Sequence, residues 1–246
     1  MTRVADGARR SWPVPVPTLR VERAILADGA SFVLGCDEVG RGALAGPVSV
    51  SIVLVDNTVS RMPQGLRDSK LLTEPRRDLL APRARAWVRA WGVGDATAAE
   101  IDEVGIMVCL GRAAVRALDG LVAQAVAGGI LNRDGLAGAP LLLDGNHDWL
   151  SAAAGPAVRV ITRTRADRDC ASVAAASVIA KVHRDQQMRR AHGEAPQYGW
   201  ENNKGYASAG HRSAIAVHGP HALHRQTWLH PERAEATGST GAGAAR

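Results

Sequence analysis

Residues 31–56, SFVLGCDEVGRGALAGPVSVSIVLVD, contain the pattern that decides the fold. The runs 31–37 and 47–56 are rich in β-branched and aliphatic residues, and a glycine-rich turn separates them. Such runs favour β-strands, and glycines between them favour a turn. We therefore expect two adjacent strands of a sheet, with the acids Asp37 and Glu38 at the end of the first strand.

Outward from this stretch, strand patterns alternate with helical patterns. Short apolar runs predict three more strands, at residues 90–93, 140–143 and 157–162. Helical spacing predicts a helix over 73–91 that Thr73 can cap and that Pro82 should kink or split, one or two helices over 97–127, and a helix over 171–191. Short helical pieces follow to about residue 231. The alternation predicts an α/β fold in which helices flank a mixed sheet, with a mostly helical C-terminal cap.

Length and composition predict a single domain. The chain has 246 residues, of which 46% are hydrophobic, which is enough for one substantial core. We expect flexible tails at residues 1–17 and 234–246, a main domain over 18–190, and a helical extension of that domain over 191–233. No apolar stretch has the length of a signal peptide or of a membrane span, so we expect a cytoplasmic protein without membrane contact, and a monomer.

The charge balance suits an acidic partner. The formal net charge is +6, and only three of the 30 basic residues are lysines, Lys70, Lys181 and Lys204. A basic chain suits a polyanion such as nucleic acid, although an excess of arginine over lysine can also reflect coding bias. The three cysteines have no spacing typical of metal ligands, which argues against a disulfide framework and a structural zinc site.

Four carboxylates follow apolar runs at the expected ends of strands. Asp37 and Glu38 follow SFVLGC, Asp144 follows PLLL, and Asp167 lies between the last strand and the alanine-rich helix. A single such acid is often only a turn or cap residue, but two adjacent acids beside a buried strand repel each other unless a cation is near. Oxygen ligands without histidine or cysteine suit Mg²⁺ or Mn²⁺. This pattern predicts phosphoryl-transfer chemistry.

The glycines after the first strand also satisfy a loose dinucleotide-binding pattern, Gly40-x-Gly42-x-x-Ala45. In a true dinucleotide site this motif opens a helix. Here residues 47–55 follow with a strand pattern, so we reject that reading.

The chain resembles the ribonuclease HII family in six segments that occur in the same order. They are Cys36-Asp-Glu-Val-Gly-Arg-Gly42, Asp68-Ser69-Lys70-Leu71-Leu72, Ala99-Glu100-Ile101-Asp102, Leu143-Asp144-Gly145-Asn146, Arg165-Ala166-Asp167 with the run Ser172 to Val182, and Asn203-Lys204-Gly205-Tyr206. The resemblance spans roughly residues 18–232. It implies a ribonuclease H-like catalytic domain.

The resemblance also implies roles for individual residues. The acids Asp37, Glu38, Asp144 and Asp167 would form a catalytic tetrad that binds two Mg²⁺ or Mn²⁺ ions. Gly40, Arg41 and Gly42 would approach the sugar edge at an RNA–DNA junction, and Tyr206 would stack on the neighbouring deoxyribose. The other expected substrate contacts are Ser69, Lys70, Asn146, Lys181 and Lys204. Lys181 could equally be a solvated side chain of its helix, and the C-terminal histidines match no trusted ligand spacing.

Three departures from the family pattern affect details of the site. Arg165-Ala166 stands where the family has Lys-Gly, Gly105 where an Asn is expected, and Ala207-Ser208 where Gly-Thr usually follows the tyrosine. The last departure puts the fine geometry near Tyr206 in doubt. The fourth acid is placed by counting back from Ser177, which excludes Asp169.

The expected function is that of an endonuclease. The resemblance implies hydrolysis of the RNA strand of RNA/DNA hybrids and incision 5′ of ribonucleotides embedded in duplex DNA, giving 5′-phosphate and 3′-hydroxyl ends. One alternative is a nucleic-acid-binding protein of the same fold that has lost catalysis, but all four acids are present. Another is the related ribonuclease HIII, whose added N-terminal domain we do not expect in the fewer than 30 residues before the first strand. Protein partners are not predicted.

Overall fold

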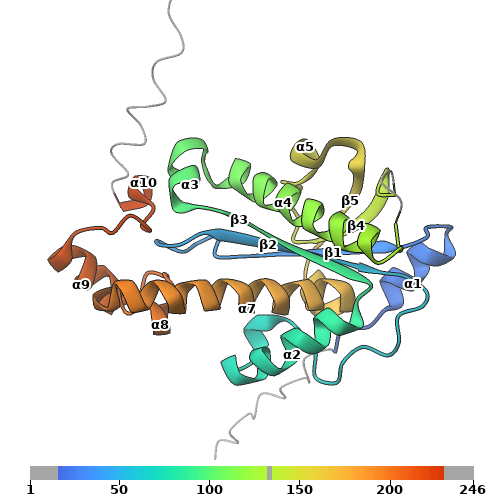
Figure 1. Ribbon diagram of the computed structural model, residues 1–246, viewed down its shortest axis with the longest axis horizontal. Coiled ribbons are helices and arrows are strands. Elements are labelled where there is room, and N and C mark those ends of the chain that lie inside the picture. Colours follow the sequence, from blue (N-terminus) through green and yellow to red (C-terminus); the bar gives the residue numbers. More distant parts are fainter. Residues whose placement is uncertain (1–15, 132–134, 230–246) are drawn as a thin grey trace, which may run out of the picture.

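The computed structural model describes residues 16–131 and 135–229. The expected tails, 1–17 and 234–246, lie outside these residues except for positions 16 and 17. Figure 1 shows a central sheet with helices on both of its faces. The architecture is the expected mixed α/β fold.

The sheet has five strands in the order β3-β2-β1-β4-β5. Strands β1 and β2 pair antiparallel, as do β2 and β3, whereas β1 with β4 and β4 with β5 are parallel. Their bounds are β1 Val33–Val39, β2 Val48–Val55, β3 Ala90–Ala96, β4 Ala139–Asp144 and β5 Val158–Arg163. All five expected strands are therefore present, and the one that carries Asp37 continues two residues past it.

Helices cover the sheet in two layers, because each element hides its apolar face against another. The bounds are α1 Arg20–Ala27, α2 Glu74–Trp87, α3 Ala98–Val104, α4 Ile106–Ala127, α5 Ser151–Ala154, α6 Ala166–Asp169 and α7 Ala171–Glu194. Helix α4 packs on one face of the sheet in one hydrophobic cluster, and α2 and α7 pack on the other face in a second cluster. The sheet is thus buried on both sides, as the uniformly buried strand β2 shows.

Two expectations about the helices need comment. Pro82 was expected to kink or split its helix; it lies inside α2, which runs from Glu74 to Trp87 without being split. Thr73 is its N-cap residue, but its side chain makes no capping hydrogen bond. The segment 97–127 forms two helices, because Gly105 adopts a φ of 82° between α3 and α4.

The C-terminal part is helical, as expected. A 3₁₀ turn at Pro196–Tyr198 precedes α8 Trp200–Asn203, α9 Ala209–His218 and α10 Gln226–Leu229. Tyr198 and Trp200 pack with Ala45 and Met188 in a small third hydrophobic cluster. This cluster fixes the C-terminal extension to the loop between β1 and β2 and to the end of α7. Along the described part of the chain, no helix is long and apolar enough to cross a membrane.

Candidate active site

The parallel pairing of β1 with β4 brings two of the predicted acids together. Cys36 of β1 is paired with Leu143 of β4, so Asp37 and Asp144 occupy the next position of the same register. Asp144 is the last residue of β4 and Asp37 lies two residues before the end of β1, so both are near the carboxyl ends of their strands, where α/β folds place their sites. Asp37 is 4% exposed, while Asp144 is partly exposed.

Glu38 follows Asp37 within β1, and its charge acts on the Asp37 carboxyl group. The expected turn after Asp37 is absent because β1 continues to Val39, which pairs with Ser49. Successive side chains of a strand point to opposite faces, so Asp37 and Glu38 lie on opposite sides of β1. The Asp37 carboxylate accepts a hydrogen bond from the Glu38 backbone N–H at 2.9 Å. The glycine turn begins only at Gly40.

Asp167 reaches the same strand end from α6. Its backbone N–H donates to a carboxylate oxygen of Asp144 at 3.3 Å, and its own side chain is buried. Asp169, two residues further on, instead forms an ion pair with Arg163 at 2.9 Å. Counting along the sequence thus selected the acid that lies beside Asp144.

Burial and mutual repulsion raise the pKa of three of these carboxyl groups. Burial, then the charges of Glu38 and Asp144, raise the pKa of Asp37 well above its usual value, against a hydrogen bond from Ser177 and the charge of Lys70. Burial also raises the pKa of Glu38, although Arg41 opposes the rise. Burial, with Asp144 and Asp68, raises the pKa of Asp167 to about 6. Asp144 contributes to each of these three shifts.

Lys70 supplies positive charge to this acidic group. Its ammonium lies 3.7 Å from an Asp167 carboxylate oxygen, and its side chain is 72% exposed. Burial lowers the pKa of Lys70, but the charges of Asp37 and Asp167 outweigh that effect and the net shift is upward. The residue stands on a 3₁₀ turn, Ser69–Leu71, that begins at Asp68. Lys70 is therefore close to the acids and also open to a ligand.

The donor set of the acids suits a hard divalent cation. All four side chains present carboxylate oxygens, the ligands that Mg²⁺ and Mn²⁺ prefer, and the raised pKa values show an excess of negative charge that such a cation would relieve. The neighbouring thiol of Cys36 is buried in the hydrophobic core. Across residues 16–131 and 135–229, however, no three acidic, histidine or cysteine side chains are arranged to hold an ion.

The loop after β1 brings the glycine motif close to Tyr206. The backbone N–H groups of Leu44 and Ala45 both donate to the carbonyl of Gly205, at 2.9 and 3.2 Å. Tyr206 follows directly and is 38% exposed. The segments that we expected to read the sugar are therefore neighbours, although about 160 residues separate them in sequence.

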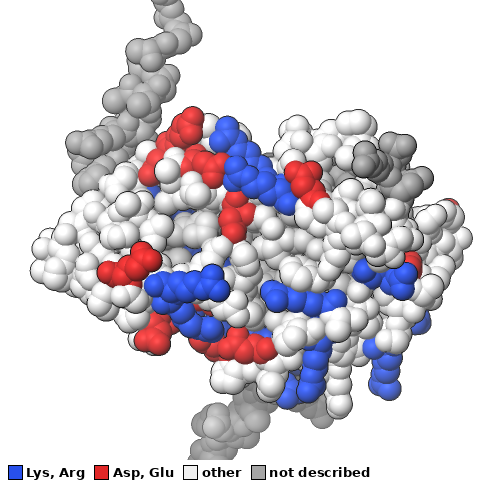
Figure 2. All heavy atoms as spheres, viewed as in Figure 1, with Lys and Arg blue, Asp and Glu red and all other residues white. Residues whose placement is uncertain are grey.

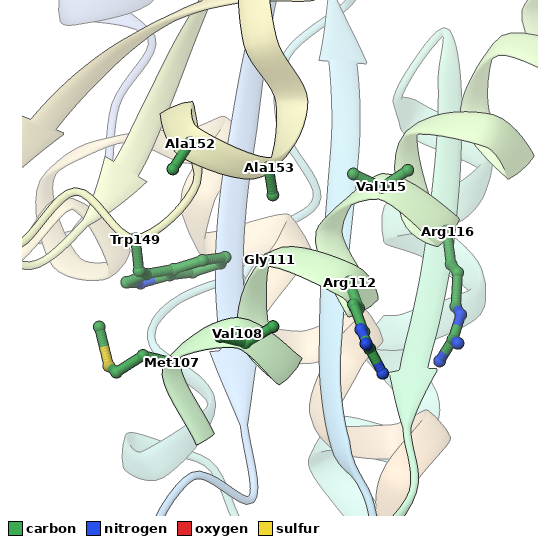
Figure 3. A pocket seen from close by; sticks show the side chains of 9 residues that line it. All are labelled: Met107, Val108, Gly111, Arg112, Val115, Arg116, Trp149, Ala152 and Ala153. Carbon is green, nitrogen blue, oxygen red and sulfur yellow. The ribbon is translucent and has the colours of Figure 1, made fainter. Parts of the chain in front are cut away.

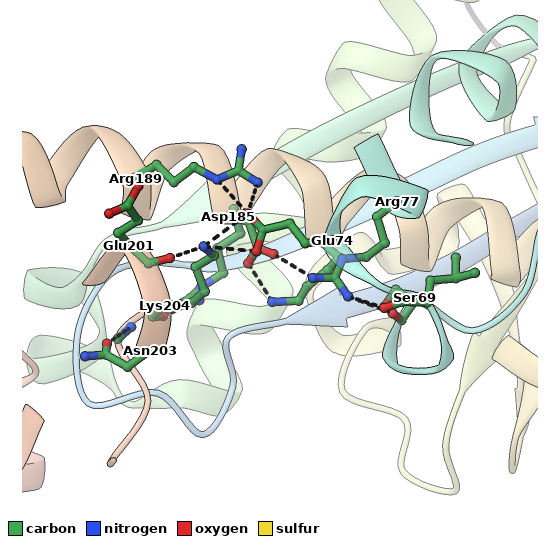
Figure 4. Close-up of polar contacts among 12 residues, drawn as sticks. Ser69, Glu74, Arg77, Asp185, Arg189, Glu201, Asn203 and Lys204 are labelled. Atoms are coloured by element: carbon green, nitrogen blue, oxygen red, sulfur yellow. Dashed lines mark hydrogen bonds and ion pairs between the residues drawn. The ribbon is translucent and has the colours of Figure 1, made fainter. Parts of the chain in front are cut away.

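The remaining expected contacts differ in their freedom to meet a substrate. Asn146 is exposed in the loop after β4, and Ser69 is buried and hydrogen-bonded to Ser177 at 2.9 Å. Lys181 forms an ion pair with Asp185 at 2.5 Å. Lys204 is 6% exposed, and its ammonium contacts the Glu201 carbonyl and, at 3.4 Å, Glu74 (Figure 4). The structure thus gives Lys204 internal partners, while Lys70 and Asn146 remain accessible.

Sequence reasoning missed several polar residues beneath this site. Ser177 lies in the alanine-rich helix α7 and is 2% exposed, and its hydroxyl contacts Ser69 and lowers the pKa of Asp37. Asp68 is buried beside Lys70. A serine within the apolar run ASVAAASVIA was a usable signal, because a buried hydroxyl needs a partner.

A cavity between α4 and α5 differs in character from the acidic site. It measures about 710 Å³ between α4 and α5 and is lined mainly by apolar side chains such as Met107, Val108 and Trp149, with Arg112 and Arg116 at one side (Figure 3). Met107 links it to the glycine motif, because its sulfur lies 3.5 Å from the Arg41 guanidinium. No carboxylate lines the cavity, so it is not the acidic site.

The face of the molecule seen in Figure 2 carries charges of both signs. Basic and acidic side chains lie together over α3 and α4, and both kinds also occur in the region of α2 and α7. Around α3 and α4, Arg112 and Arg116 both pair with Glu100. Net charge alone therefore does not mark a substrate surface on this face.

Comparison with known proteins identifies the family. The family model described as Ribonuclease HII matches residues 34–230. Ribonuclease HII of Streptomyces griseus is 44% identical over 222 residues, which cover 89% of this chain and 86% of that protein. Ribonuclease HII of Paracoccus denitrificans is 39% identical and covers 86% and 91% of the two chains.

Solved structures agree with the fold. Ribonuclease H2 from Pyrococcus horikoshii superposes with a TM-score of 0.61 at 23% identity, covering 85% of this chain and 100% of that one. An RNase HII from Archaeoglobus fulgidus, solved in complex with PCNA, gives a TM-score of 0.58 at 26% identity, covering 80% and 95%. The sequence matches, the mixed sheet and the acids at its strand ends lead to one conclusion: the chain belongs to the ribonuclease HII family of metal-dependent endoribonucleases.

Proposed function

We propose that the protein hydrolyses the RNA strand of RNA/DNA hybrids and incises 5′ of ribonucleotides embedded in duplex DNA. The observation that carries this proposal is the β1–β4 register, which places Asp37 beside Asp144 at the strand ends. The Asp167 N–H on Asp144 and the Lys70 ammonium near Asp167 complete the group. The products would carry 5′-phosphate and 3′-hydroxyl ends.

The acids would act by holding two divalent ions, Mg²⁺ or Mn²⁺. Such ions supply the positive charge that lets water attack a phosphodiester and that stabilises the leaving 3′ oxygen. The ligands that we propose are Asp37, Glu38, Asp144 and Asp167. Of these, Asp37 and Asp144 lie next to each other on the paired strands β1 and β4. A bound cation would also keep Asp167, whose pKa is raised to about 6, in its charged form at neutral pH.

Recognition would use the groups around the acids. Lys70 is exposed and can contact a backbone phosphate. The backbone of Gly40, Arg41 and Gly42 would sense the 2′-hydroxyl, which both donates and accepts hydrogen bonds. Tyr206 would stack on the deoxyribose beside the ribonucleotide. Its exposed ring is available for that contact.

A cleavage assay with three duplexes tests the proposal. The protein is incubated with duplex DNA that holds one ribonucleotide, with an RNA/DNA hybrid, and with plain duplex DNA, each in Mg²⁺, Mn²⁺ or chelator. We expect metal-dependent cutting of the first two and none of the third. Failure to cut either ribose-containing duplex would contradict the activity, and cutting of plain DNA would contradict the specificity.

A further inference from the structure

Two buried arginines hold the loop that carries the glycine motif. Residues 40–47 connect β1 to β2, and Arg225 from the C-terminal extension donates to three of their carbonyl groups. Its guanidinium contacts the carbonyls of Gly40 at 2.7 Å, Arg41 at 2.9 Å and Gly46 at 3.2 Å. Arg225 therefore fixes the direction of these backbone carbonyl groups.

Arg184 of α7 holds the other end of the same loop and joins it to the tyrosine segment. Its guanidinium donates to the carbonyls of Pro47 at 2.8 Å and Ala45 at 2.9 Å. Its third hydrogen bond, at 2.8 Å, goes to the carbonyl of Lys204, and the guanidinium carbon lies 5.5 Å from the ring centre of Tyr206. One side chain thus contacts both segments that we propose to read the sugar.

Both arginines lie in the interior and donate their hydrogen bonds to backbone carbonyls. Both are 0% exposed, and within the part of the chain that the structure describes neither takes part in an ion pair. Burial lowers the pKa of Arg184, and burial together with the charge of Arg184 lowers the pKa of Arg225 to about 9. An unpaired buried cation is costly unless its hydrogen bonds are satisfied. Here backbone carbonyls accept the hydrogen bonds of both guanidinium groups. The two arginines therefore hold the loop in its conformation.

The opposite side of the motif is left available. Among the described residues, the N–H groups of Arg41 and Gly42 donate no hydrogen bond, whereas those of Ala43 to Gly46 all do. A methyl group built at Gly42 would meet no atom within 4 Å, while one built at Gly40 would lie 2.1 Å from the Arg184 Nε. The packing therefore explains Gly40 but not Gly42, and leaves the donors at 41 and 42 open to a ligand.

We propose that Arg184 and Arg225 are positioning residues for sugar recognition. Arg225 holds the carbonyls of residues 40 and 41 inward so that the N–H groups of Arg41 and Gly42 can meet the ribose. Arg184 sets the distance between that loop and the Tyr206 ring. This inference rests on the proposed function, because it assigns the loop and the ring to the two sugars of an RNA–DNA junction.

Substitution by glutamine and by methionine separates hydrogen bonding from packing. Glutamine keeps a donor for the carbonyls without the charge, whereas methionine fills space without a donor. The variants are Arg225→Gln, Arg225→Met, Arg184→Gln and Arg184→Met. Arg85→Met is the matched control, because Arg85 also stacks on an aromatic ring, that of Trp91 at 4.5 Å, but lies on α2 away from the loop. Thermal unfolding checks that each variant is folded, and Mn²⁺ titration checks that the acidic residues still bind the ion.

The expected result is a rise in KM that is larger when the substitution removes more of the arginine's hydrogen-bond donors. For duplex DNA with one ribonucleotide, the methionine variants should raise KM by about 10- to 100-fold, the range that loss of a charged hydrogen bond produces, and glutamine should restore part of the loss. Mn²⁺ affinity should stay unchanged, and kcat should fall less than KM rises. The Arg85→Met variant should keep the wild-type KM even if it lowers the unfolding temperature.

A second substrate distinguishes the two arginines. On an RNA/DNA hybrid every sugar of the cut strand is ribose, so stacking of Tyr206 on a deoxyribose is absent. Arg225 variants should therefore have a raised KM for both substrates. Arg184 variants should show a larger rise in KM for the single-ribonucleotide duplex than for the hybrid.

Two results would count against these assignments, and a third would count against the proposed function on which they rest. Folded glutamine variants with wild-type KM on both substrates would overturn the positioning role, and they decide the matter if the methionine variants fail to fold. An equal rise in KM for the two substrates in the Arg184 variants would contradict the proposal that Arg184 positions the Tyr206 ring. Absence of cleavage by the wild-type protein would instead refute the proposed function.

Discussion

At the scale of single residues, Asp37 and Glu38 show how two adjacent acids fit into one strand. They lie on opposite sides of β1, and Asp37 rather than Glu38 is in register with Asp144. The sequence predicted acids at strand ends, because each follows an apolar run. It could not predict their directions, which depend on the pairing of Val39 with Ser49 that extends β1 past both acids.

The two glycines of the motif should respond differently to alanine. Gly40 has a φ of 85° and no room for a methyl group, so Gly40→Ala should lower the free energy of unfolding by about 1–3 kcal/mol. Gly42 has room, so Gly42→Ala should change that free energy by less than about 0.5 kcal/mol. Urea unfolding measures both. Gly42→Ala should nevertheless weaken cleavage at a ribonucleotide, and full activity would show that the substrate does not approach this position closely.

The lysines should separate into one that contacts phosphate and one that supports the fold. Lys70 is exposed, so Lys70→Met should reduce the slope of log affinity against log salt by about one while lowering stability by less than about 1 kcal/mol. Lys204 is buried, so Lys204→Met should cost about 1–3 kcal/mol and leave the salt slope unchanged. Binding of a ribonucleotide-containing duplex to metal-free protein, measured from 50 to 200 mM salt, tests this. An unchanged slope for Lys70→Met would remove it from the substrate contacts.

At the scale of elements, a histidine network holds the C-terminal helices together. His211 of α9 donates from Nδ1 to the Tyr206 carbonyl at 2.8 Å, so its Nε2 accepts from Trp200 at 3.0 Å and faces His224 at 3.1 Å. The Nδ1 of His224 accepts from the His221 N–H at 2.7 Å. These bonds require neutral imidazoles, and they connect α8, α9 and the chain before α10. His211, His221 and His224, which matched no ligand spacing, thus have a structural role.

Acidification should weaken this network. Burial lowers the pKa of His211, and burial with the charge of His211 lowers the pKa of His224 to about 4, below the usual 6.5. The unfolded chain therefore binds more protons, and the stabilisation is complete above pH 6.5 and is lost as the pH falls toward 4, by up to about 3 kcal/mol. Urea unfolding of wild type and His224→Asn between pH 7 and pH 4 measures this effect. Asparagine can replace the Nδ1 acceptor without binding a proton.

The control for that comparison is His147→Asn, because His147 is exposed. The stability advantage of the wild type over His224→Asn should shrink with falling pH, and it should shrink by more than any change in the difference between the wild type and His147→Asn. A constant advantage over His224→Asn would contradict the neutral network.

The elements also show where local sequence patterns are sufficient. The strands and α7 were predictable because their apolar runs or helix-forming residues act locally. The unbroken passage of α2 through Pro82 was not, since packing against α7 outweighs one lost hydrogen bond. Nor was the role of Arg225, whose partners at residues 40, 41 and 46 lie about 180 residues earlier in the chain.

At the scale of the whole molecule, segments that are far apart in the sequence come together at one end of the sheet, near the carboxyl ends of β1 and β4. Strands β1 and β4 and helix α6 bring the acids, the turn at residues 69–71 brings Lys70, and the C-terminal extension supports the glycine loop. Fold class and family were predictable, because the six segments that resemble the family occur in the same order along the chain. The arrangement of the four side chains was not, since it depends on the sheet register and on the contact of α6 with the end of β4.

The most direct test of the account is the single-turnover rate of cutting at one ribonucleotide in duplex DNA with Mg²⁺. Asp37→Asn and Asp167→Asn should each lower this rate by at least about a hundredfold, because each removes charge from the ion-binding group. Asp169→Asn, which loses only its ion pair with Arg163, should cut at nearly the wild-type rate. Near-normal cutting by Asp37→Asn, or equal losses for Asp167→Asn and Asp169→Asn, would contradict the assignment of the acids.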